Sequence, residues 1–198
     1  MNMRVGVQRR KVRVMPTTPA DLDWLLECCD RPELAAAFGL EPPASAHVRR
    51  TLTRGGIAGI IFRAEARVGF VLVFPPTDQL TFWELAYAIP DTAHRDGVTA
   101  IHAADAMIHY LFEVAAVETV GWRTREDNEA SEAVIRRAGY APFGRWVVDG
   151  VPFVFYAIDA AVWSARKARL EAQEHAQPTP GGLFRWVPVP EAASPGPQ

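Results

Sequence analysis

The sequence predicts a mixed α/β fold built around a central sheet of about six to seven strands. Three observations support it: charged and apolar residues alternate in several short segments, apolar residues recur at helical spacing in others, and Pro, Gly and Asp separate the segments. Some strands are expected next to one another and others are separated by a helix, so the sheet should be mixed. With 198 residues, 49% of them hydrophobic, the chain can bury one full core.

The first half reads as a strand, a helical region and three further strands. Lys11 to Met15 alternates charged and apolar residues, and Thr17 to Asp21 supplies Pro and cap residues for a helix. Gly55 to Phe62 and Arg67 to Phe74 form a predicted hairpin. Leu80 to Ile89 is an aromatic-rich strand that ends at a proline.

The second half reads as helix, strand, helix and a final antiparallel hairpin. Ala100 to Phe112 carries apolar residues at helical spacing, and Val117 to Thr124 returns to strand. After the next helix, Arg145 to Val148 and Val151 to Ile158 flank Asp149-Gly150, one of the strongest short signals for a hairpin.

Three regions are expected along the chain: a flexible N-terminus at residues 1–10, one domain at 11–163, and a helix with a Pro-rich tail at 164–198. Trp163 to His175 can continue as a polar helix, and the remainder has little periodicity. Within it, Leu183 to Pro190 is unusually apolar, which favours packing back on the domain over a role as a peptide docking motif. We expect removal of the residues after Gln177 to leave the fold intact.

Charge and cysteine usage exclude several classes of function. A formal net charge of -2 gives no general electrostatic case for binding nucleic acid or an anionic membrane. Cys28 and Cys29 are adjacent, which suits neither a disulfide nor a metal site, so no metal and a reducing, cytoplasmic location are expected. No apolar run is long enough to span a bilayer.

Asn128 and Ser131 form the most informative local pair. They lie three residues apart at the start of a predicted helix, so an amide and a hydroxyl can face one bound object. The alternative is helix capping by Asp127 or Asn128, worth about 1 kcal/mol.

Four sequence segments, taken in order, resemble the GNAT superfamily of N-acetyltransferases, in particular its ribosomal-protein N-terminal acetyltransferase (RimJ/RimL) branch. They are ELAYAIP, HRDGVTA, REDNEAS and RRAGYAPFGR. The resemblance covers roughly Lys11 to Trp163. It implies helices on both faces of the sheet and a splay between the fourth and fifth strands, Leu80 to Ile89 and Val117 to Thr124. The pantetheine arm of acetyl-CoA would occupy that gap.

The resemblance also implies cofactor contacts. A bulge near Ala86, Tyr87 and Ala88 would present a backbone N–H to the thioester carbonyl, where an oxyanion develops. Asn128 would bind the pantetheine arm, with Ser131 near the sulfur. The loop that holds the pyrophosphate at a helix N-terminus departs from the family pattern and can be aligned in two ways. In one alignment the motif falls on His94, Gly97 and Thr99, and we prefer it because it keeps a glycine at the turn. In the other alignment the motif falls on Arg95, Val98 and Ala100.

For catalysis the resemblance points to Glu84 as the base, acting through a water, and to Ser131 as support for the departing thiolate. The alternative for Glu84 is an ordinary exposed strand glutamate. Trp83, Tyr87 and Trp146 are candidates for lining an acceptor site, although core packing is an alternative for each. Substrate choice is expected to involve Cys28 to Thr53 and the last hairpin, with Arg145, Trp146 and Tyr156.

Tyr140 and three histidines are not assigned to the site. For Tyr140, core packing is favoured over a role as general acid. His94, His102 and His109 lie on or near one helix without a third metal ligand, so they are read as solvated.

The expected function is therefore transfer of acetyl from acetyl-CoA to a primary amine, either a protein N-terminus or a small-molecule amine, by direct attack in a ternary complex. One alternative is a longer acyl donor or an acyl carrier protein. Another is a non-catalytic module of the same fold. A monomer and a homodimer are both compatible with the sequence.

Overall fold

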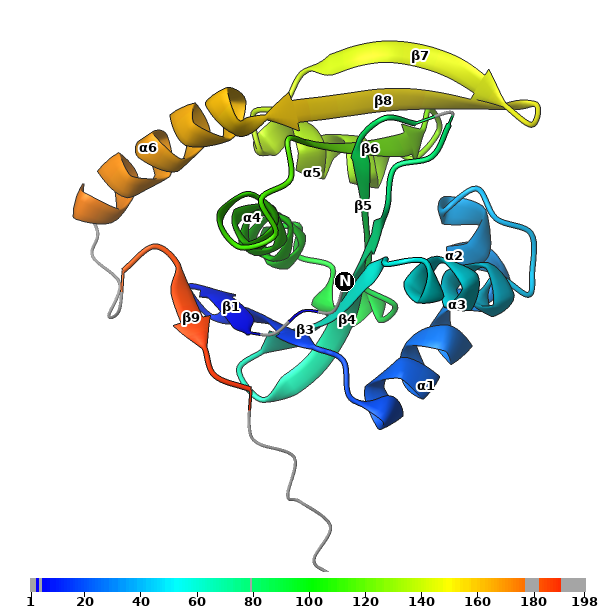
Figure 1. Ribbon diagram of the computed structural model, residues 1–198, viewed down its shortest axis with the longest axis horizontal. Coiled ribbons are helices and arrows are strands. Elements are labelled where there is room, and N and C mark those ends of the chain that lie inside the picture. Colours follow the sequence, from blue (N-terminus) through cyan, green and yellow to red (C-terminus); the bar gives the residue numbers. More distant parts are fainter. Residues whose placement is uncertain (1–2, 4, 79, 177–181, 190–198) are drawn as a thin grey trace, which may run out of the picture.

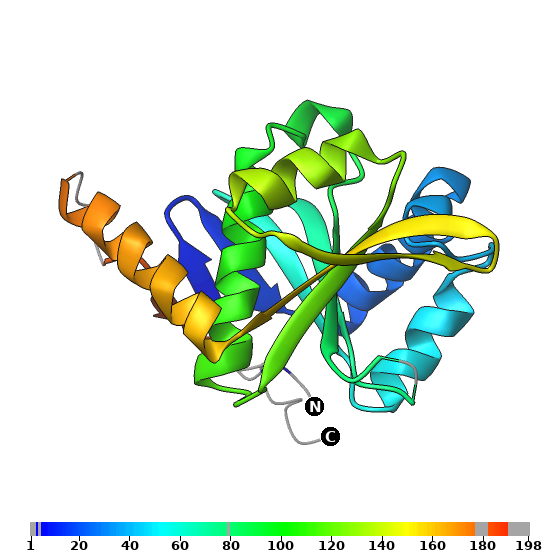
Figure 2. The same ribbon diagram turned by 90° about the horizontal axis from the view of Figure 1, so that it is seen from above.

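The structure is a computed structural model that describes residues 3, 5–78, 80–176 and 182–189. Within these residues the chain forms one nine-stranded sheet in the order β7-β8-β6-β5-β4-β3-β2-β1-β9, with helices on both faces (Figures 1 and 2). The strands are β1 (Gly6–Arg9), β2 (Val12–Pro16), β3 (Ile57–Arg63), β4 (Ala66–Phe74), β5 (Trp83–Ala88), β6 (Thr119–Arg125), β7 (Pro142–Val148), β8 (Val151–Asp159) and β9 (Arg185–Val187). The helices are α1 (Pro19–Cys29), α2 (Pro32–Ala37), α3 (Ser45–Thr53), α4 (Val98–Glu113), α5 (Glu129–Arg137) and α6 (Ala160–Ala176), with a 3₁₀ turn at Thr92–His94.

The two faces of the sheet bury separate cores, and β4 shows how the sequence assigns them. Val71 and Val73 face the core shared with α4 and α5, whereas Phe70 and Leu72 face the core shared with α1, α2 and α3. This alternation follows from the two-residue period of a strand. Both faces are apolar along β3 and β4, as expected for a sheet covered on both sides.

The sheet splits between β5 and β6, which confirms the predicted splay. These parallel strands pair only at Trp83↔Val120 and Glu84↔Gly121 and then diverge. In contrast, the register between β4 and β5 is regular from Phe74↔Glu84 to Phe70↔Ala88. The bulge expected at residues 86–88 is therefore absent from this pair. The β5 backbone groups that face the gap are released because β6 turns away.

The last hairpin, β7 and β8, is closed by the turn that the sequence predicted. Asp149 and Gly150 both have positive φ, 50° and 79°, which matches the twist of the flanking strands. The hairpin lies at one edge of the sheet (Figure 1).

Both chain ends add a strand that the sequence analysis did not predict. Residues 6–9 were expected to be flexible but form β1, which pairs with β2 and β9. β9 pairs at Gly6↔Val187 and buries Leu183, so the apolar tail segment packs back on the domain as predicted. These additions raise the strand number above the six or seven expected. Residues 190–198 of the Pro-rich tail lie outside the described part of the chain.

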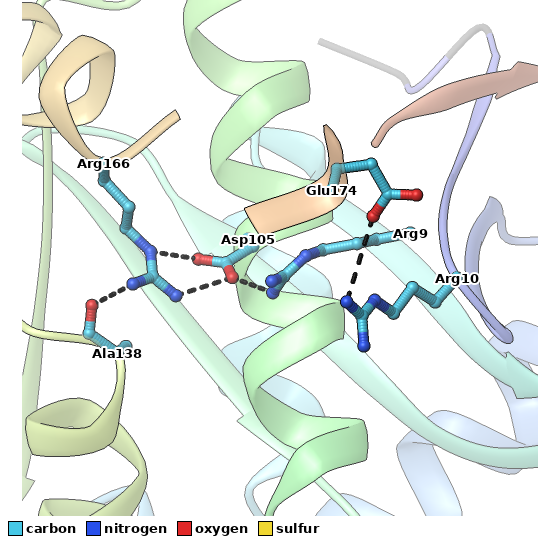
Figure 3. Close-up of polar contacts among 6 residues, drawn as sticks. All are labelled: Arg9, Arg10, Asp105, Ala138, Arg166 and Glu174. Atoms are coloured by element: carbon cyan, nitrogen blue, oxygen red, sulfur yellow. Dashed lines mark hydrogen bonds and ion pairs between the residues drawn. The ribbon is translucent and has the colours of Figure 1, made fainter. Parts of the chain in front are cut away.

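A buried carboxylate on α4 joins this helix to β1 and α6 (Figure 3). Asp105 is fully buried and accepts hydrogen bonds from Arg9 of β1 and from Arg166 of α6, with Arg166 Nε at 2.7 Å. Arg166 also donates to the carbonyl of Ala138, at the end of α5. Because bonds to a buried charge are strong, this group fixes β1, α4, α5 and α6 relative to one another.

Candidate active site

A cavity of about 500 Å³ opens where β5 and β6 diverge. Residues of α2, β5, β6, α5 and the loop before α4 line it. Much of the wall is apolar, and the polar groups come mainly from β6, α5 and that loop. A concave apolar site with few polar groups is typical of small-molecule binding.

Asn128 and Ser131 both line this cavity, and Asn128 also caps α5. Asn128 Oδ1 accepts a hydrogen bond of 3.1 Å from the backbone N–H of Ser131. The capping interpretation is thus confirmed, but it occupies only the oxygen of the amide. Within the described residues, the Asn128 side-chain nitrogen donates to no protein group, which leaves it available to a ligand.

Strand β5 presents different chemistry on its two faces. Glu84 lies opposite to Leu85 and Tyr87 along the strand, on the side of α2 and α3, where Ala86 also packs. Tyr87 packs on the α4 side and reaches the cavity. The Tyr87 phenol therefore lines the larger cavity, whereas the Glu84 carboxylate lines a smaller cavity on the opposite face of β5.

Glu84 is not the ordinary exposed glutamate of the alternative interpretation. Its side chain is 13% exposed, and its Oε1 accepts a 2.9 Å ion-paired contact from Arg123 Nε. Burial raises the pKa of Glu84, and the Arg123 guanidinium opposes that rise. Glu84 lines a small cavity of about 40 Å³ that shares Ala86 and Arg123 with the larger one.

The residues of the loop before α4 that line the cavity come partly from one predicted alignment of the phosphate motif and partly from the other. Arg95, Gly97 and Ala100 line it. Gly97 has φ 69° and begins the helix, a conformation that favours glycine. His94, Val98 and Thr99, also expected to contact the cofactor, do not line the cavity; Val98 is half exposed and Thr99 is buried.

Asp96 occupies the N-terminus of α4. Its Oδ1 accepts a 2.7 Å hydrogen bond from the backbone N–H of Thr99, and its Oδ2 pairs with Arg63 Nη1 at 2.7 Å. Although desolvation raises the pKa of Asp96, hydrogen bonds from Thr99 and the charge of Arg63 lower it overall. The chain's own carboxylate therefore takes a position that would otherwise suit an anion.

Two cations lie at the loop end of the cavity. Arg95 Nε donates to the carbonyl of Ile89 at 2.8 Å, and Arg137 Nη1 is 3.2 Å from the position of a Cβ at Gly97. Both arginines are exposed and line the cavity. Sequence reasoning missed Arg137, although Ala130, Val134 and Arg137 share one helical face.

The residues fit the two ends of a CoA molecule unequally. The apolar walls and the Asn128 amide suit a pantetheine arm, and Arg95 and Arg137 suit phosphates. At the helix N-terminus, however, a phosphate would meet the carboxylate of Asp96.

Two predicted acceptor residues lie away from the cavity. Trp83 packs against the core shared with α4, and Trp146 is 48% exposed on β7, where it contacts Phe143 and Phe155. Neither lines the cavity. Tyr87, the third predicted acceptor residue, lines the cavity.

Tyr140 packs in the core, as predicted. Its ring contacts Trp122 at 4.8 Å between centroids, and Arg166 lies over it at 5.1 Å. Burial raises the pKa of Tyr140.

The expectation of solvated histidines is wrong for His109. It is 6% exposed and stacks on Phe184 with 4.2 Å between ring centroids, and on Trp186. Its ring is covered by the tail strand, which the sequence analysis treated as separable. Among the described residues, no group of three or more His, Cys, Asp or Glu side chains could hold a metal ion. The same residues contain no helix with the length and apolarity needed to cross a membrane.

The comparisons with known proteins agree with the fold. Residues 11–141 match the family model described as an acetyltransferase (GNAT) domain. The chain therefore belongs to the GNAT acetyltransferase family and is an N-acyltransferase. A search of curated protein sequences finds no significant match.

Several solved structures share this fold at low sequence identity. A protein from T. thermophilus assigned as an acetyltransferase is 23% identical, with TM-score 0.66, over 85% of this chain and 96% of that one. RimJ from Mycobacterium smegmatis, solved with CoA-disulfide, is 17% identical, with TM-score 0.62, over 83% and 93%. Spermidine N-acetyltransferase from Vibrio cholerae, solved with CoA and spermine, is 11% identical, with TM-score 0.65, over 78% and 98%.

Proposed function

We propose that the protein transfers an acetyl group from acetyl-CoA to a primary amine by direct attack in a ternary complex. The observation that carries this proposal is the cavity at the β5–β6 divergence, with Asn128 and Ser131 on one wall and the partly buried Glu84–Arg123 pair beside it. Backbone groups of β5 released at the divergence supply donors for the developing oxyanion.

Glu84 is the base in this proposal. An amine attacks a thioester only in its neutral form, so a proton has to leave the ammonium. A buried carboxylate with a raised pKa is a stronger base than an exposed one, and Arg123 keeps it ionised and oriented. A water between Glu84 and the amine would carry the proton.

The cysteine positions support direct attack over an acyl-enzyme on sulfur. The chain has only two cysteines, Cys28 and Cys29, and both are buried in α1. Burial raises the pKa of both thiols, that of Cys29 to about 12. Neither thiol lines the cavity, so neither offers a thiolate to the thioester.

The acceptor is proposed to enter from the α2 side. Glu33, Ala37 and Phe38, of this helix and its C-terminal end, line the cavity, and Glu33 is an exposed acid at the rim. An acid on the approach favours an amine that arrives as an ammonium ion. Within this class, a protein N-terminus of the RimJ/RimL kind and a small-molecule amine are the two candidates.

Asp96 favours a second candidate donor, an acyl carrier protein. A phosphopantetheine on a carrier lacks the pyrophosphate and adenine of CoA. It would therefore not need the α4 N-terminus that Asp96 occupies.

Calorimetry with acetyl-CoA, followed by a thiol-release assay over amines and peptides, tests the proposal. We expect micromolar binding of acetyl-CoA, thiol release that depends on the amine, and intersecting initial-velocity lines, which a ternary complex gives. Acylation by an acyl carrier protein without binding of any CoA ester would select the second donor. A folded sample that uses neither donor would overturn the proposed function.

A further inference from the structure

A second cavity, of about 630 Å³, lies between α4, α6 and the tail segment that contains β9 (Figure 1). It shares no lining residue with the cavity at the β5–β6 divergence. On α4, the nearest lining residues of the two cavities are Ala100 and His109, about 14 Å apart along the helix axis. The volume of the second cavity is in the range of small-molecule sites.

His109 lines this second cavity with its hydrogen-bonding capacity unused. It is 6% exposed, and its ring is held by stacking on Phe184 at 4.2 Å and on Trp186 at 5.1 Å between centroids. Among the described residues no group forms a hydrogen bond with either ring nitrogen, and Nδ1 is enclosed. Packing therefore fixes the ring. A buried polar group without a hydrogen-bond partner calls for an explanation, and a ligand in the cavity supplies one.

Glu113 determines which nitrogen of His109 is open to a ligand. Its Oε1 is 3.8 Å from Nδ1, beyond hydrogen-bond distance, and its negative charge favours the tautomer with the proton on Nδ1. Burial lowers the pKa of His109 to about 4, so the ring is neutral at neutral pH. Nε2 is then an acceptor, and its complement is an N–H or O–H donor.

The charges around the second cavity favour a cation. Its wall carries three glutamates and one lysine, namely Glu113, Glu171, Glu174 and Lys167. Lys167 pairs with Glu113 at 2.8 Å, and Arg10, from outside the wall, approaches Glu174 at 3.9 Å. Glu171 is exposed on α6, and within the described part of the chain its carboxylate forms no ion pair. One carboxylate is thus available to a positively charged ligand.

The tail segment supplies the apolar side of the second cavity. Leu183, Phe184 and Trp186 line it, and Trp186 is 43% exposed. Aromatic side chains bury apolar and planar groups, and an aromatic face also attracts a cation. The ligand that fits both sides therefore has a positive charge at one end and an aromatic or apolar body at the other.

We propose that this cavity is a second ligand site, which binds a primary ammonium ion carried on an aromatic body. The ammonium donates one N–H to His109 Nε2 and is neutralised by Glu171, while the aromatic body packs against Phe184 and Trp186. The site does not depend on acetyl transfer. Because the tail segment forms one wall, a bound ligand also stabilises the packing of β9 on the domain.

The test follows the indole N–H resonance of Trp186 in the ¹⁵N-labelled full chain as phenethylammonium chloride is added. Trp186→Phe assigns the resonance. We expect a saturable shift with a Kd below about 1 mM. The neutral 2-phenylethanol should bind at least about tenfold more weakly, and phenylacetate should cause no saturable shift, since the site selects positive charge.

Two variants of the cavity wall separate the contacts. Glu171→Gln removes the carboxylate charge, and His109→Phe keeps an aromatic ring for stacking but removes the acceptor nitrogen. Each should weaken phenethylammonium binding about tenfold. Glu129→Gln is the matched control, because Glu129 is an exposed helix glutamate outside both cavities. It should bind the probe with the wild-type Kd.

The Trp186 resonance keeps the two cavities apart. Phenethylammonium that binds only at the β5–β6 divergence would leave this resonance unchanged, and that result would overturn the second site without affecting the proposed function. A response to phenylacetate equal to that to phenethylammonium, or wild-type affinity in both wall variants, would also overturn it. A chain that acetylates no amine would leave the second site in place if the Trp186 shift saturates as expected.

Discussion

Glu84 is the residue in which burial, charge pairing and position combine most clearly. Its carboxylate lies beside the gap between β5 and β6, is held by Arg123, and has a pKa raised by desolvation. A base works only when it is deprotonated. Turnover should therefore fall as the pH drops through this raised pKa, at a pH above the ordinary glutamate value of about 4.3.

Glu84→Gln should remove the base and keep the shape of the site. We expect kcat at neutral pH to fall by about 100-fold, with the acid limb of the pH–rate profile lost, because the amide cannot accept the proton. Steady-state kinetics across pH measures both. Glu126→Gln is the control, since Glu126 pairs with Arg145 on the surface. A variant with the wild-type rate and pH profile would exclude Glu84 as the base.

Asp96 sets the charge at the entrance to α4. Its carboxylate and the donor phosphates would compete for the same backbone N–H groups. Replacing it should therefore strengthen donor binding even though it weakens the helix cap. Asp96 thus stabilises the fold through the helix cap and at the same time lowers the affinity for the donor.

Asp96→Ala should raise the affinity for acetyl-CoA about tenfold, because it removes one negative charge from the phosphate position, and should cost about 1 kcal/mol of stability. Calorimetry and thermal unfolding measure the two effects. Asp91→Ala is a matched control: Asp91 caps the 3₁₀ turn through Ala93 but does not line the cavity. Unchanged or weaker CoA binding in Asp96→Ala would show that the phosphates bind elsewhere.

The sequence could predict Asn128 and Glu84 as site candidates but not the role of Asp96. Asn128 and Glu84 belong to sequence segments that carry the resemblance to the family, one at the start of a helix and one on a strand. Asp96 falls at a loop position to which the resemblance assigned no role. Its importance comes from a hydrogen bond to Thr99 and an ion pair with Arg63, on a distant strand, neither of which a local pattern shows.

At the scale of elements, the first turn of α5 performs two tasks with one side chain. The oxygen of Asn128 caps the helix through the N–H of Ser131, and its nitrogen faces outward from that bond. An aspartate keeps the capping oxygen and loses the amide donor. The pair of substitutions Asn128→Asp and Asn128→Ala therefore separates the two tasks.

Asn128→Asp should unfold at the wild-type temperature or slightly above, because a carboxylate at a helix N-terminus is favourable. It should bind acetyl-CoA at least about tenfold more weakly, since one hydrogen bond to the donor is lost. Asn128→Ala should lose both affinity and about 1 kcal/mol of stability. Thermal unfolding and calorimetry distinguish these results. Full affinity in Asn128→Asp would leave capping as the only role of this residue.

Element prediction succeeded where the signal is local and failed where the partner is distant. The β7–β8 turn follows from Asp149-Gly150, and α1 from the reciprocal cap of Thr18 and Asp21. By contrast, β9 has three residues and gains its strand character from pairing with β1, at the other end of the chain. No periodicity is readable in so short a segment.

For the whole molecule, the tail segment Leu183 to Val187 packs against the core. Leu183 is buried, and Phe184 and Trp186 cover His109. The expectation that removal of the residues after Gln177 leaves the fold intact is therefore not supported. Their removal would uncover one face of α4 together with its histidine.

Truncation after Ala176 should lower the free energy of unfolding by about 2 kcal/mol or more, from the exposure of Leu183 and its neighbours. For a chain of this size that is a fall in Tm of roughly 4 to 8 °C. Differential scanning calorimetry measures it, with removal of only residues 190–198 as the control. Equal Tm values for the two truncated chains would contradict the role of β9.

His109 should make stability depend on pH in the acid range. Burial lowers its pKa to about 4, helped by Lys167 and opposed by Glu113. The unfolded chain thus takes up the proton first. The stabilising effect of the neutral ring is complete above about pH 6.5 and decreases toward pH 4, by at most about 3 kcal/mol.

His109→Phe keeps the stacking on Phe184 and removes the titrating ring, so the loss of stability between about pH 6.5 and 4 should be shallower. His102, whose pKa is also lowered to about 4, accounts for a remaining slope. Urea unfolding at several pH values measures the difference. An identical pH dependence in wild type and variant would place the acid sensitivity elsewhere.

The pairing of β1 with β9 also determines how the chain could be circularly permuted. Gly6 is opposite Val187 in an antiparallel pair, so the chain leaves the sheet after β9 beside the point where it enters before β1. A short peptide linker could join them as a hairpin, and new termini could be opened at the Ala64–Glu65 turn between β3 and β4. Such a circular permutant should keep the cavity between β5 and β6, because none of its walls is cut.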